Sequence, residues 1–134
     1  MCGIAGVLNP ADFRDHLERN AKAMADSLAY RGPDDHGVWS DPDCGVALTH
    51  RRLSIVDLSP AGHQPMVSAD GRFIITYNGE IYNFQEFRPE LEARGIQFRG
   101  HSDTEVMLEA IAAYGVEATV KRLIGMRTAL YFVI

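Results

Sequence analysis

The sequence has few cysteines and no long apolar run, and both absences narrow the class of protein. Two cysteines, Cys2 and Cys44, stand among 134 residues, so a disulfide framework is excluded and a reduced, cytoplasmic protein is expected. No run of ~18 apolar residues occurs, which excludes a transmembrane helix. The first residues also lack the basic segment of a secretory signal peptide.

Blocks of like charge and motifs for metal or phosphate binding are also absent. Lysine and arginine total 13 against 18 aspartates and glutamates, which gives a net charge of −5 without any block of like charge. A nucleic-acid partner or an anionic membrane surface is therefore not expected. The histidines and cysteines show neither C-x-x-C nor H-x-x-x-H spacing, and no glycine-rich phosphate loop is present. We therefore expect no metal site and no cofactor in this chain.

What is present is an ordinary globular composition, with 46% apolar and 23% charged residues, and a length typical of one domain. Apolar periodicity and turn residues predict strands over 3–8, 45–49, 73–77, 96–98 and 128–134. They predict helices over 12–30, 84–91, 102–114 and 116–123, with irregular segments over 31–37 and 51–65. Strands and helices mix without regular βαβ alternation, which favours an α+β fold with largely antiparallel sheets.

Cys2 is the first candidate catalytic residue because it follows Met1. Removal of Met1 would leave a thiol and a free α-amine on one residue, with pKa values near ~8.5 and ~7.7–8.0. The partly neutral amine would then serve as base for the thiol, which is the N-terminal nucleophile arrangement. The alternative is a small buried cysteine at a frayed end. The apolar run that follows favours the nucleophile, because it tethers the terminus and its glycines allow close approach.

The pair Asn78-Gly79 follows an apolar strand, and two interpretations stay open. Asn-Gly after such a strand is a strong hairpin signal. The same pair can form an oxyanion hole, because an asparagine amide and a glycine N–H can both point at one developing negative oxygen. From these residues alone the hairpin is favoured.

Arg52 and Asp103 are candidate binding residues for a charged ligand. Arg52 would hold a carboxylate through two hydrogen bonds, although Arg51-Arg52 also fits a solvated charged pair, which the residues alone favour. Asp103 is predicted to belong to a helix N-terminus with Ser102 as cap and Glu105 closing the box. It would also be able to bind an ammonium group, because a helix start can present a side chain into a cleft. The adjacent residues 101–103 cannot form a hydrolase triad, whose members converge in space.

Six segments, in this order, resemble the glutaminase domain of glutamine-dependent asparagine synthetases, which are class II, N-terminal nucleophile glutamine amidotransferases. The resemblance runs from residue 2 to about residue 126. The first segment is shared across class II amidotransferases, whereas the loop over 51–65 and the segment over 78–83 are far more specific and favour the asparagine-synthetase type over glucosamine-phosphate synthase or the purine amidotransferase. The segments are Met1-Cys2-Gly3-Ile4-Ala5-Gly6, Arg31-Gly32-Pro33-Asp34, His50-Arg51-Arg52-Leu53-Ser54-Ile55-Val56-Asp57, Gly62-His63-Gln64-Pro65, Asn78-Gly79-Glu80-Ile81-Tyr82-Asn83 and Ser102-Asp103-Thr104-Glu105.

The resemblance implies a fold and a role for each matching residue. The fold would be a four-layer αββα sandwich of two antiparallel sheets. Cys2 would be the nucleophile with its own α-amine as base, and Asn78 and Gly79 would form the oxyanion hole. Six residues would bind glutamine. Arg52 would bind its α-carboxylate, and Asp103 and Glu80 would hold its α-amino group. The backbone groups of Leu53, Ile55 and Val56 would line the rest of the pocket.

The resemblance also sets expectations for the whole protein. Relatives continue differently after Gly125-Met126, so residues 1–134 would be a partial type-2 glutaminase domain, incomplete at its C-terminus, with the synthetase domain and its ATP and Mg absent. The expected reaction is hydrolysis of L-glutamine to glutamate and ammonia, with the synthetase domain as partner in a full-length relative. The oligomeric state stays open. The alternatives are a non-catalytic or regulatory fragment, or an N-terminal nucleophile amidase for another amide.

Overall fold

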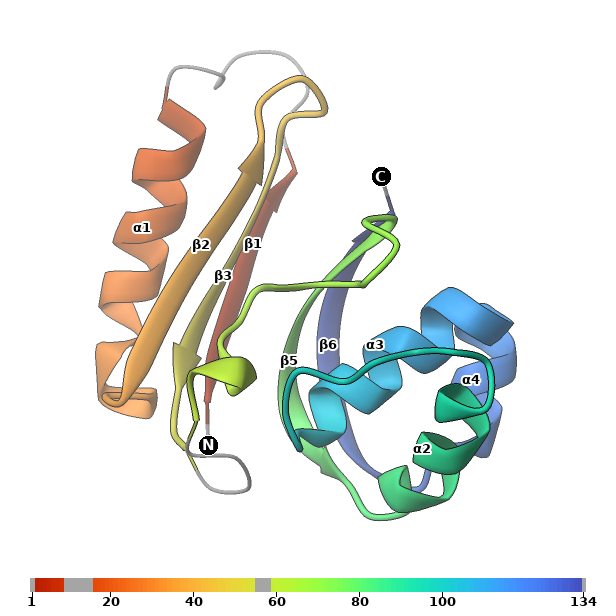
Figure 1. Ribbon diagram of the computed structural model, residues 1–134. Coiled ribbons are helices and arrows are strands. Elements are labelled where there is room, and N and C mark those ends of the chain that lie inside the picture. Colours follow the sequence, from red (N-terminus) through yellow and green to blue (C-terminus); the bar gives the residue numbers. More distant parts are fainter. Residues whose placement is uncertain (1, 9–15, 55–58, 134) are drawn as a thin grey trace.

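The computed structural model describes residues 2–8, 16–54 and 59–133 (Figure 1). Within these ranges the chain forms two antiparallel three-stranded sheets and four α-helices. The first sheet has the order β1-β3-β2 and the second β4-β5-β6. The strands are β1 (Gly3–Leu8), β2 (Asp35–Asp41), β3 (Val46–Arg52), β4 (Met66–Val67), β5 (Phe73–Ile81) and β6 (Gly125–Val133). The predicted α+β class with antiparallel sheets is confirmed.

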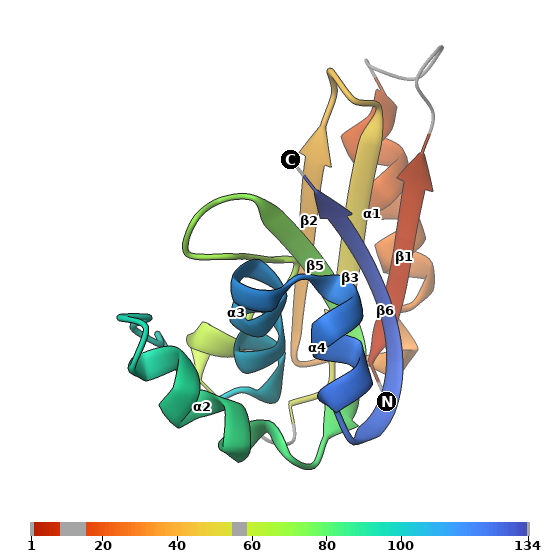
Figure 2. The ribbon, with the colours of Figure 1, turned by 90° about the vertical axis from the view of Figure 1, so that its right-hand side faces the viewer.

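The helices lie on the outer sides of the two sheets (Figures 1 and 2). Helix α1 packs on the first sheet, and the other three pack beside the second, where α3 contacts β4 and β5. The two sheets face each other, because β3 contacts β5 and β1 contacts both β5 and β6. The helices are α1 (Leu17–Ser27), α2 (Phe84–Glu92), α3 (Asp103–Tyr114) and α4 (Val116–Arg122). No helix in the described ranges is long and apolar enough to cross a membrane.

Each sheet buries an apolar face against its helices. Leu17 and Ala21 of α1 are one helical turn apart and pack on Ala47 of β3. The larger core lies on the second sheet, where Ile75 and Tyr77 of β5 belong to one cluster with apolar residues of α2 and α3. Successive strand residues point to opposite faces, so Thr76, between these two on β5, faces the other sheet, where its Oγ1 donates to the carbonyl of Thr49 on β3.

Several predicted elements match the structure in type and place. The strand over 3–8 is β1, the one over 45–49 is the first part of β3, and the tail forms β6. Helix α3 begins after Ser102, whose Oγ accepts the N–H of Glu105 over 3.1 Å as the capping motif predicts. The Glu105 carboxylate does not close the box, because it accepts the N–H groups of Arg99 and Gly100 instead. Helix α1 ends at Ser27 and a short 3-10 turn follows, whereas residues 12–15 of the predicted helix lie outside the described residues.

Three predictions about local structure are wrong. The segment over 31–37 is not irregular throughout, because β2 begins at Asp35 and pairs with β3 along its whole length. Residues 96–98 form no strand. Asn78-Gly79 is not a hairpin turn: β5 continues through both residues, which pair with residues 128 and 127 of β6. A type I′ hairpin needs positive φ at both positions, and neither residue has it.

Candidate active site

A cavity of about 210 Å³ opens at the end of the two sheets where the N-terminus lies. It has room for a ligand the size of an amino acid, since one water occupies ~30 Å³ of the liquid. The walls come from the start of β1, the end of β3, the segment over 62–64, the end of β5 and the start of α3. The lining residues are Cys2, His50, Arg52, Leu53, Gly62, Gln64, Tyr77, Asn78, Gly79, Glu80, Ser102, Asp103, Thr104 and Met126.

Cys2 is half-buried and held at the cavity wall by backbone groups. Its Sγ accepts a hydrogen bond from the N–H of Leu53 over 3.3 Å and lies 3.7 Å from the Leu53 carbonyl oxygen, to which the thiol donates. Its own carbonyl oxygen accepts from Nε of Arg31 over 3.1 Å. Cys44 is exposed, in the connection between β2 and β3, and does not line the cavity. The two free thiols therefore stand in different surroundings.

Arg52 enters the cavity because of strand alternation. Arg51 and Arg52 end β3 and point to opposite faces. Arg51 donates to the carbonyl of Ala25 on α1 over 2.9 Å, whereas Arg52 is 8% exposed and lines the cavity. The interpretation as a solvated charged pair is therefore wrong for Arg52. Its Nη1 donates to the carbonyl of Ser59 over 2.9 Å, which holds the guanidinium in place.

Asn78 and Gly79 lie on β5 beside the cavity. Asn78 is on the face of β5 that points to the first sheet, and within the described residues its side-chain amide forms no hydrogen bond. Gly79 permits the close approach of β6, because a Cβ there would lie 2.1 Å from the carbonyl oxygen of Met126 and 2.5 Å from Oη of Tyr77. The glycine thus serves a close backbone approach and not a turn.

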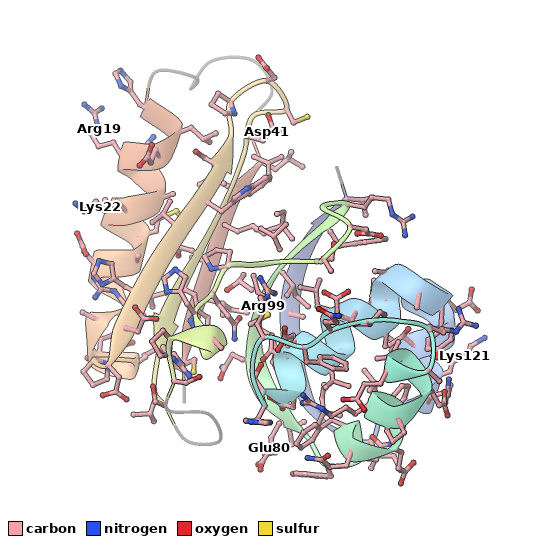
Figure 3. The ribbon with its side chains drawn as sticks, in the orientation of Figure 1. Arg19, Lys22, Asp41, Glu80, Arg99 and Lys121 are labelled. Atoms are coloured by element: carbon pink, nitrogen blue, oxygen red, sulfur yellow. The ribbon has the colours of Figure 1, made fainter. Side chains whose placement is uncertain are left out.

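Asp103 is the first residue of α3 and is 6% exposed. Its Oδ2 accepts the N–H of Ile81 over 2.9 Å, and its Oδ1 accepts its neighbour's N–H, that of Thr104, over 2.9 Å. Burial raises the pKa of the Asp103 carboxyl, these hydrogen bonds lower it, and the nearby charge of Glu80 raises it further. Glu80 itself is exposed at the end of β5 (Figure 3). A cation entering this corner would relieve the cost of the buried charge.

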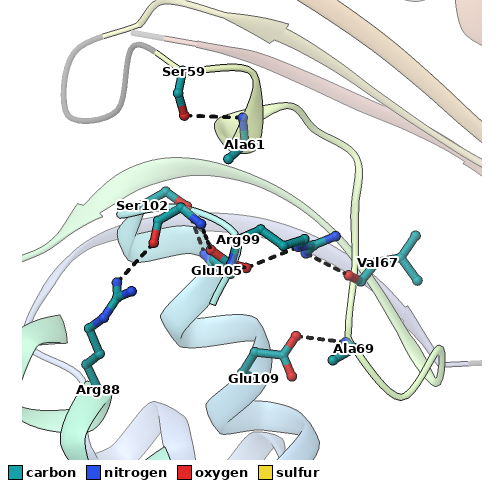
Figure 4. A network of polar contacts seen from close by, with 10 residues as sticks. Ser59, Ala61, Val67, Ala69, Arg88, Arg99, Ser102, Glu105 and Glu109 are labelled. Atoms are coloured by element: carbon teal, nitrogen blue, oxygen red, sulfur yellow. Dashed lines mark hydrogen bonds and ion pairs between the residues drawn. The ribbon is translucent and has the colours of Figure 1, made fainter. Parts of the chain in front are cut away.

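The loop before α3 is fixed by a second buried carboxylate (Figure 4). Glu105 is 1% exposed, and its Oε1 accepts from the backbone N–H of Arg99 over 2.8 Å and from Nε of the same arginine over 3.1 Å. Its Oε2 accepts the N–H of Gly100 over 2.9 Å. The start of the helix, and with it Asp103, is therefore held by several hydrogen bonds.

The structure adds cavity residues that the sequence analysis does not single out. His50 lies on the same face of β3 as Arg52, two residues away, so alternation along the strand would have indicated it. Gln64, Tyr77 and Thr104 also line the cavity, although no sequence signal marks Tyr77. Burial lowers the pKa of His50 to about 4, and the nearby charge of Arg52 lowers it too, while the hydrogen bond to the Tyr77 carbonyl opposes both. His50 is therefore neutral at physiological pH.

Of the nine predicted site residues, seven line this cavity. The other two, Ile55 and Val56, lie outside the described residues. Among the residues that are described, no three His, Cys, Asp or Glu side chains come together in a way that could hold a metal ion. The polar side chains of the cavity include a thiol, an arginine, an imidazole, two amides, hydroxyls and carboxylates.

Comparison with known proteins identifies the family. Residues 1–132 match the model of the glutamine amidotransferase domain. The chain is 42% identical over 123 residues to glutamine-hydrolyzing asparagine synthetase 1 of Bacillus subtilis (strain 168), and 40% identical over 109 residues to a probable glutamine-hydrolyzing asparagine synthetase of Dictyostelium discoideum. It is also 36% identical over 125 residues to amidase chry2 of Gibberella zeae. The chain therefore belongs to the glutamine amidotransferase domain family.

These matches cover most of this chain but a small share of each relative. They include 90%, 81% and 87% of this chain and 19%, 19% and 18% of the respective relatives. The chain thus spans about a fifth of the length of the curated relatives it matches.

Proposed function

We propose that this chain hydrolyses the side-chain amide of L-glutamine to glutamate and ammonia, as the ammonia-supplying part of a glutamine-hydrolysing asparagine synthetase. One observation supports this most strongly. Residues from four segments far apart in the sequence, Cys2, Arg52, Asn78 and Asp103, line one cavity. They supply a nucleophile, a cation, an amide donor and an anion, which are the groups needed to bind and cleave the amide of an α-amino acid.

The proposed reaction begins at Cys2 once Met1 has been removed. The neutral α-amine takes the proton of the thiol, and Sγ attacks the side-chain amide carbon of glutamine. The resulting oxyanion accepts hydrogen bonds from the Asn78 side-chain amide and the Gly79 N–H. The proton held by the α-amine passes to the leaving nitrogen, so that ammonia departs and a γ-glutamyl thioester remains. Water then attacks the thioester and releases glutamate and the free thiol.

Recognition of glutamine would use its two charged ends. Arg52 binds the α-carboxylate, and its guanidinium is already oriented by the Ser59 carbonyl. Asp103 binds the α-ammonium, with Glu80 contributing to the negative potential of that corner. Leu53 would contribute to the pocket through its backbone, and the same role is predicted for Ile55 and Val56, which lie outside the described residues. An amidase for an uncharged amide would have no use for a buried arginine and a buried aspartate in one cavity, which favours glutamine over that alternative.

The setting of the domain is part of the proposal. The names of the relatives at 40–43% identity favour asparagine synthesis as the use of the ammonia. A synthetase domain that uses ATP and Mg would then be the partner, and the domain itself would need no cofactor. We further propose that the two sheets and their outer helices belong to a four-layer αββα sandwich of the N-terminal nucleophile type. A reducing compartment such as the cytoplasm suits the free thiol.

The test is glutamate release from glutamine by protein whose mass shows that Met1 is gone. Cys2→Ala is expected to abolish turnover, and Cys44→Ala is the matched control that should keep it. An electrophilic glutamine analogue is expected to label Cys2 alone. Labelling of Cys44, or turnover by Cys2→Ala, would contradict the proposal. Processed wild-type protein without any glutamate release would favour a non-catalytic or regulatory role.

A further inference from the structure

The peptide of Tyr77 lies next to Asn78, and two buried side chains hold its polar groups. The N–H of Tyr77 donates to Oε1 of Gln64 over 2.6 Å, and its carbonyl oxygen accepts from Nε2 of His50 over 3.1 Å. Gln64 is 6% exposed and His50 is 1% exposed. A buried backbone group needs a hydrogen-bond partner. At this point of β5, side chains supply both partners where a sheet would ordinarily supply a neighbouring strand.

The pairing of β4 with β5 explains why a side chain is used. Met66 pairs with Ile75 and residue 67 with residue 74, so the same register would set Gln64 opposite Tyr77. Strand β4 begins at Met66, so the backbone of Gln64 lies before the ladder. The side-chain carbonyl of Gln64 therefore takes the place of a backbone carbonyl and continues the ladder by one more hydrogen bond.

The side-chain nitrogen of Gln64 reaches the start of α3, which forms another wall of the cavity. Its Nε2 donates to Oγ1 of Thr104 over 3.4 Å. Thr104 follows Asp103 at the start of α3, as Tyr77 precedes Asn78 on β5. One buried side chain thus connects the neighbours of two residues to which the proposed function gives different tasks, stabilisation of the oxyanion and binding of the ammonium.

We infer that Gln64 is a positioning residue for glutamine hydrolysis: it fixes the Tyr77 peptide, and with it the Asn78 amide, relative to the start of α3. The inference rests on the proposed function. A catalytic group displaced by ~1 Å can lose about 100-fold in rate. Loss of Gln64 is therefore expected to lower kcat, because the oxyanion donor is needed most in the transition state.

The chain offers a matched control at the other end of the same ladder. There the N–H of Phe73 donates to Oγ of Ser68, over 3.0 Å, and Ser68 is 4% exposed. Ser68→Ala and Gln64→Ala each remove a buried side-chain oxygen that accepts a β5 N–H, but Ser68 does not line the cavity. Both variants are expected to unfold at a lower temperature. Only Gln64→Ala is expected to lower kcat, by about 10- to 100-fold with a much smaller change in KM.

Two thiol reagents give a readout that a loss of stability alone would not produce. An aldehyde analogue of glutamine forms a tetrahedral adduct that needs the oxyanion donors, whereas iodoacetamide alkylates the thiol without them. Gln64→Ala is expected to weaken the aldehyde by the factor lost in kcat and to leave the iodoacetamide rate at Cys2 unchanged. Gln64→Glu keeps an oxygen for the Tyr77 N–H, so it is expected to keep more of kcat and serves if Gln64→Ala does not fold.

The outcomes separate this inference from the proposed function. Wild-type protein that neither releases glutamate nor binds the aldehyde overturns the proposed function, and the inference falls with it. Active wild-type protein together with equal kcat for Gln64→Ala and Ser68→Ala overturns the inference alone. The inference is also overturned if Gln64→Ala slows the reaction of Cys2 with iodoacetamide as much as it lowers kcat, or if it raises KM and leaves kcat unchanged. Neither result would reflect a displaced oxyanion donor.

Discussion

The sulfur of Cys2 accepts a hydrogen bond from the backbone N–H of Leu53 over 3.3 Å, and this contact joins the residue before β1 to the residue after β3 at one end of the first sheet. Leu53 directly follows Arg52, so the thiol is tied to the residue after the arginine proposed to bind the α-carboxylate of glutamine. Arg31 adds a second tie through the carbonyl of Cys2. The proposed nucleophile and the proposed substrate anchor are therefore both placed by the paired strands β1 and β3.

Replacement of Arg52 by alanine is expected to weaken glutamine binding. A charge-assisted hydrogen bond in a partly buried site contributes on the order of 1.5–3 kcal/mol, or roughly 10- to 150-fold in kcat/KM. The loss should be much smaller for a glutamine analogue that lacks the α-carboxylate. Steady-state kinetics with both substrates measure this difference.

Arg51→Ala is the matched control, since this neighbour faces α1 and contacts Ala25 and Asp26. It is expected to lower stability and to leave KM for glutamine unchanged. If Arg52→Ala weakens both substrates equally, the arginine only supports the structure of the loop.

Replacement of Asn78 by alanine is expected to act on kcat. Removal of one oxyanion donor typically costs ~10²–10³ in kcat, whereas the ground-state amide of glutamine gains little from this donor. Asn83→Ala is a suitable control, because Asn83 bonds to Arg122 and Ile124 at the base of β6, outside the cavity. Glutamate release under saturating glutamine distinguishes the two. A rise in KM with unchanged kcat would show that Asn78 does not stabilise the transition state.

The sequence predicted the elements whose signals are local, and it missed those that depend on a partner strand. Ser102 before an apolar run marks the start of α3, and the structure has the cap where predicted. Strand β2 carries Asp35 and Gly37, residues with low strand propensity, and it forms because β3 offers a complete ladder beside it. Propensity gives no information about such a partner.

Asn78-Gly79 shows why one motif can support two interpretations. The pair has the composition of a hairpin turn, yet Gly79 is needed because Met126 of β6 passes too close for a Cβ. The contact joins residues far apart in the chain, so no local pattern reveals it. Seven of the predicted site residues meet in the cavity, whereas the role of Gln64 could not be predicted because it depends on β4 beginning only at Met66.

Gly62 is expected to control the position of the Arg52 guanidinium. A Cβ at residue 62 would lie 2.1 Å from Nη2 of Arg52, while Nη1 of the same guanidinium donates to the Ser59 carbonyl. Gly62→Ala must therefore displace the guanidinium, and we expect KM for glutamine to rise by about tenfold, the effect of losing ~1.4 kcal/mol. In an Arg52→Ala background the same substitution should change KM little. Additive effects in this double-mutant cycle would contradict the contact.

His50 is expected to make the free energy of unfolding depend on pH. Its pKa is lowered from its ordinary value of 6.5 to about 4, chiefly by burial. As the pH falls below about 6.5, the unfolded chain binds a proton that the folded chain does not bind until about pH 4. The folded state is therefore destabilised across this interval, by about 3 kcal/mol in total, and this contribution is constant above pH 7.

Denaturant unfolding of wild type and of His50→Gln at several pH values measures the contribution of His50 to the free energy of unfolding. Glutamine keeps a donor for the Tyr77 carbonyl but does not titrate, so the variant should lose less stability between pH 6.5 and pH 4. Burial raises the pKa of the Asp103 and Glu109 carboxyls. As the pH falls toward the acid end of this interval, these two carboxyls bind protons in the folded chain before they do so in the unfolded chain. Their protonation therefore stabilises the folded state and opposes the effect of His50. Because both carboxyls are present in both proteins, their contribution cancels in the difference. Parallel curves for the two proteins would show that His50 is protonated equally in the folded and unfolded chains.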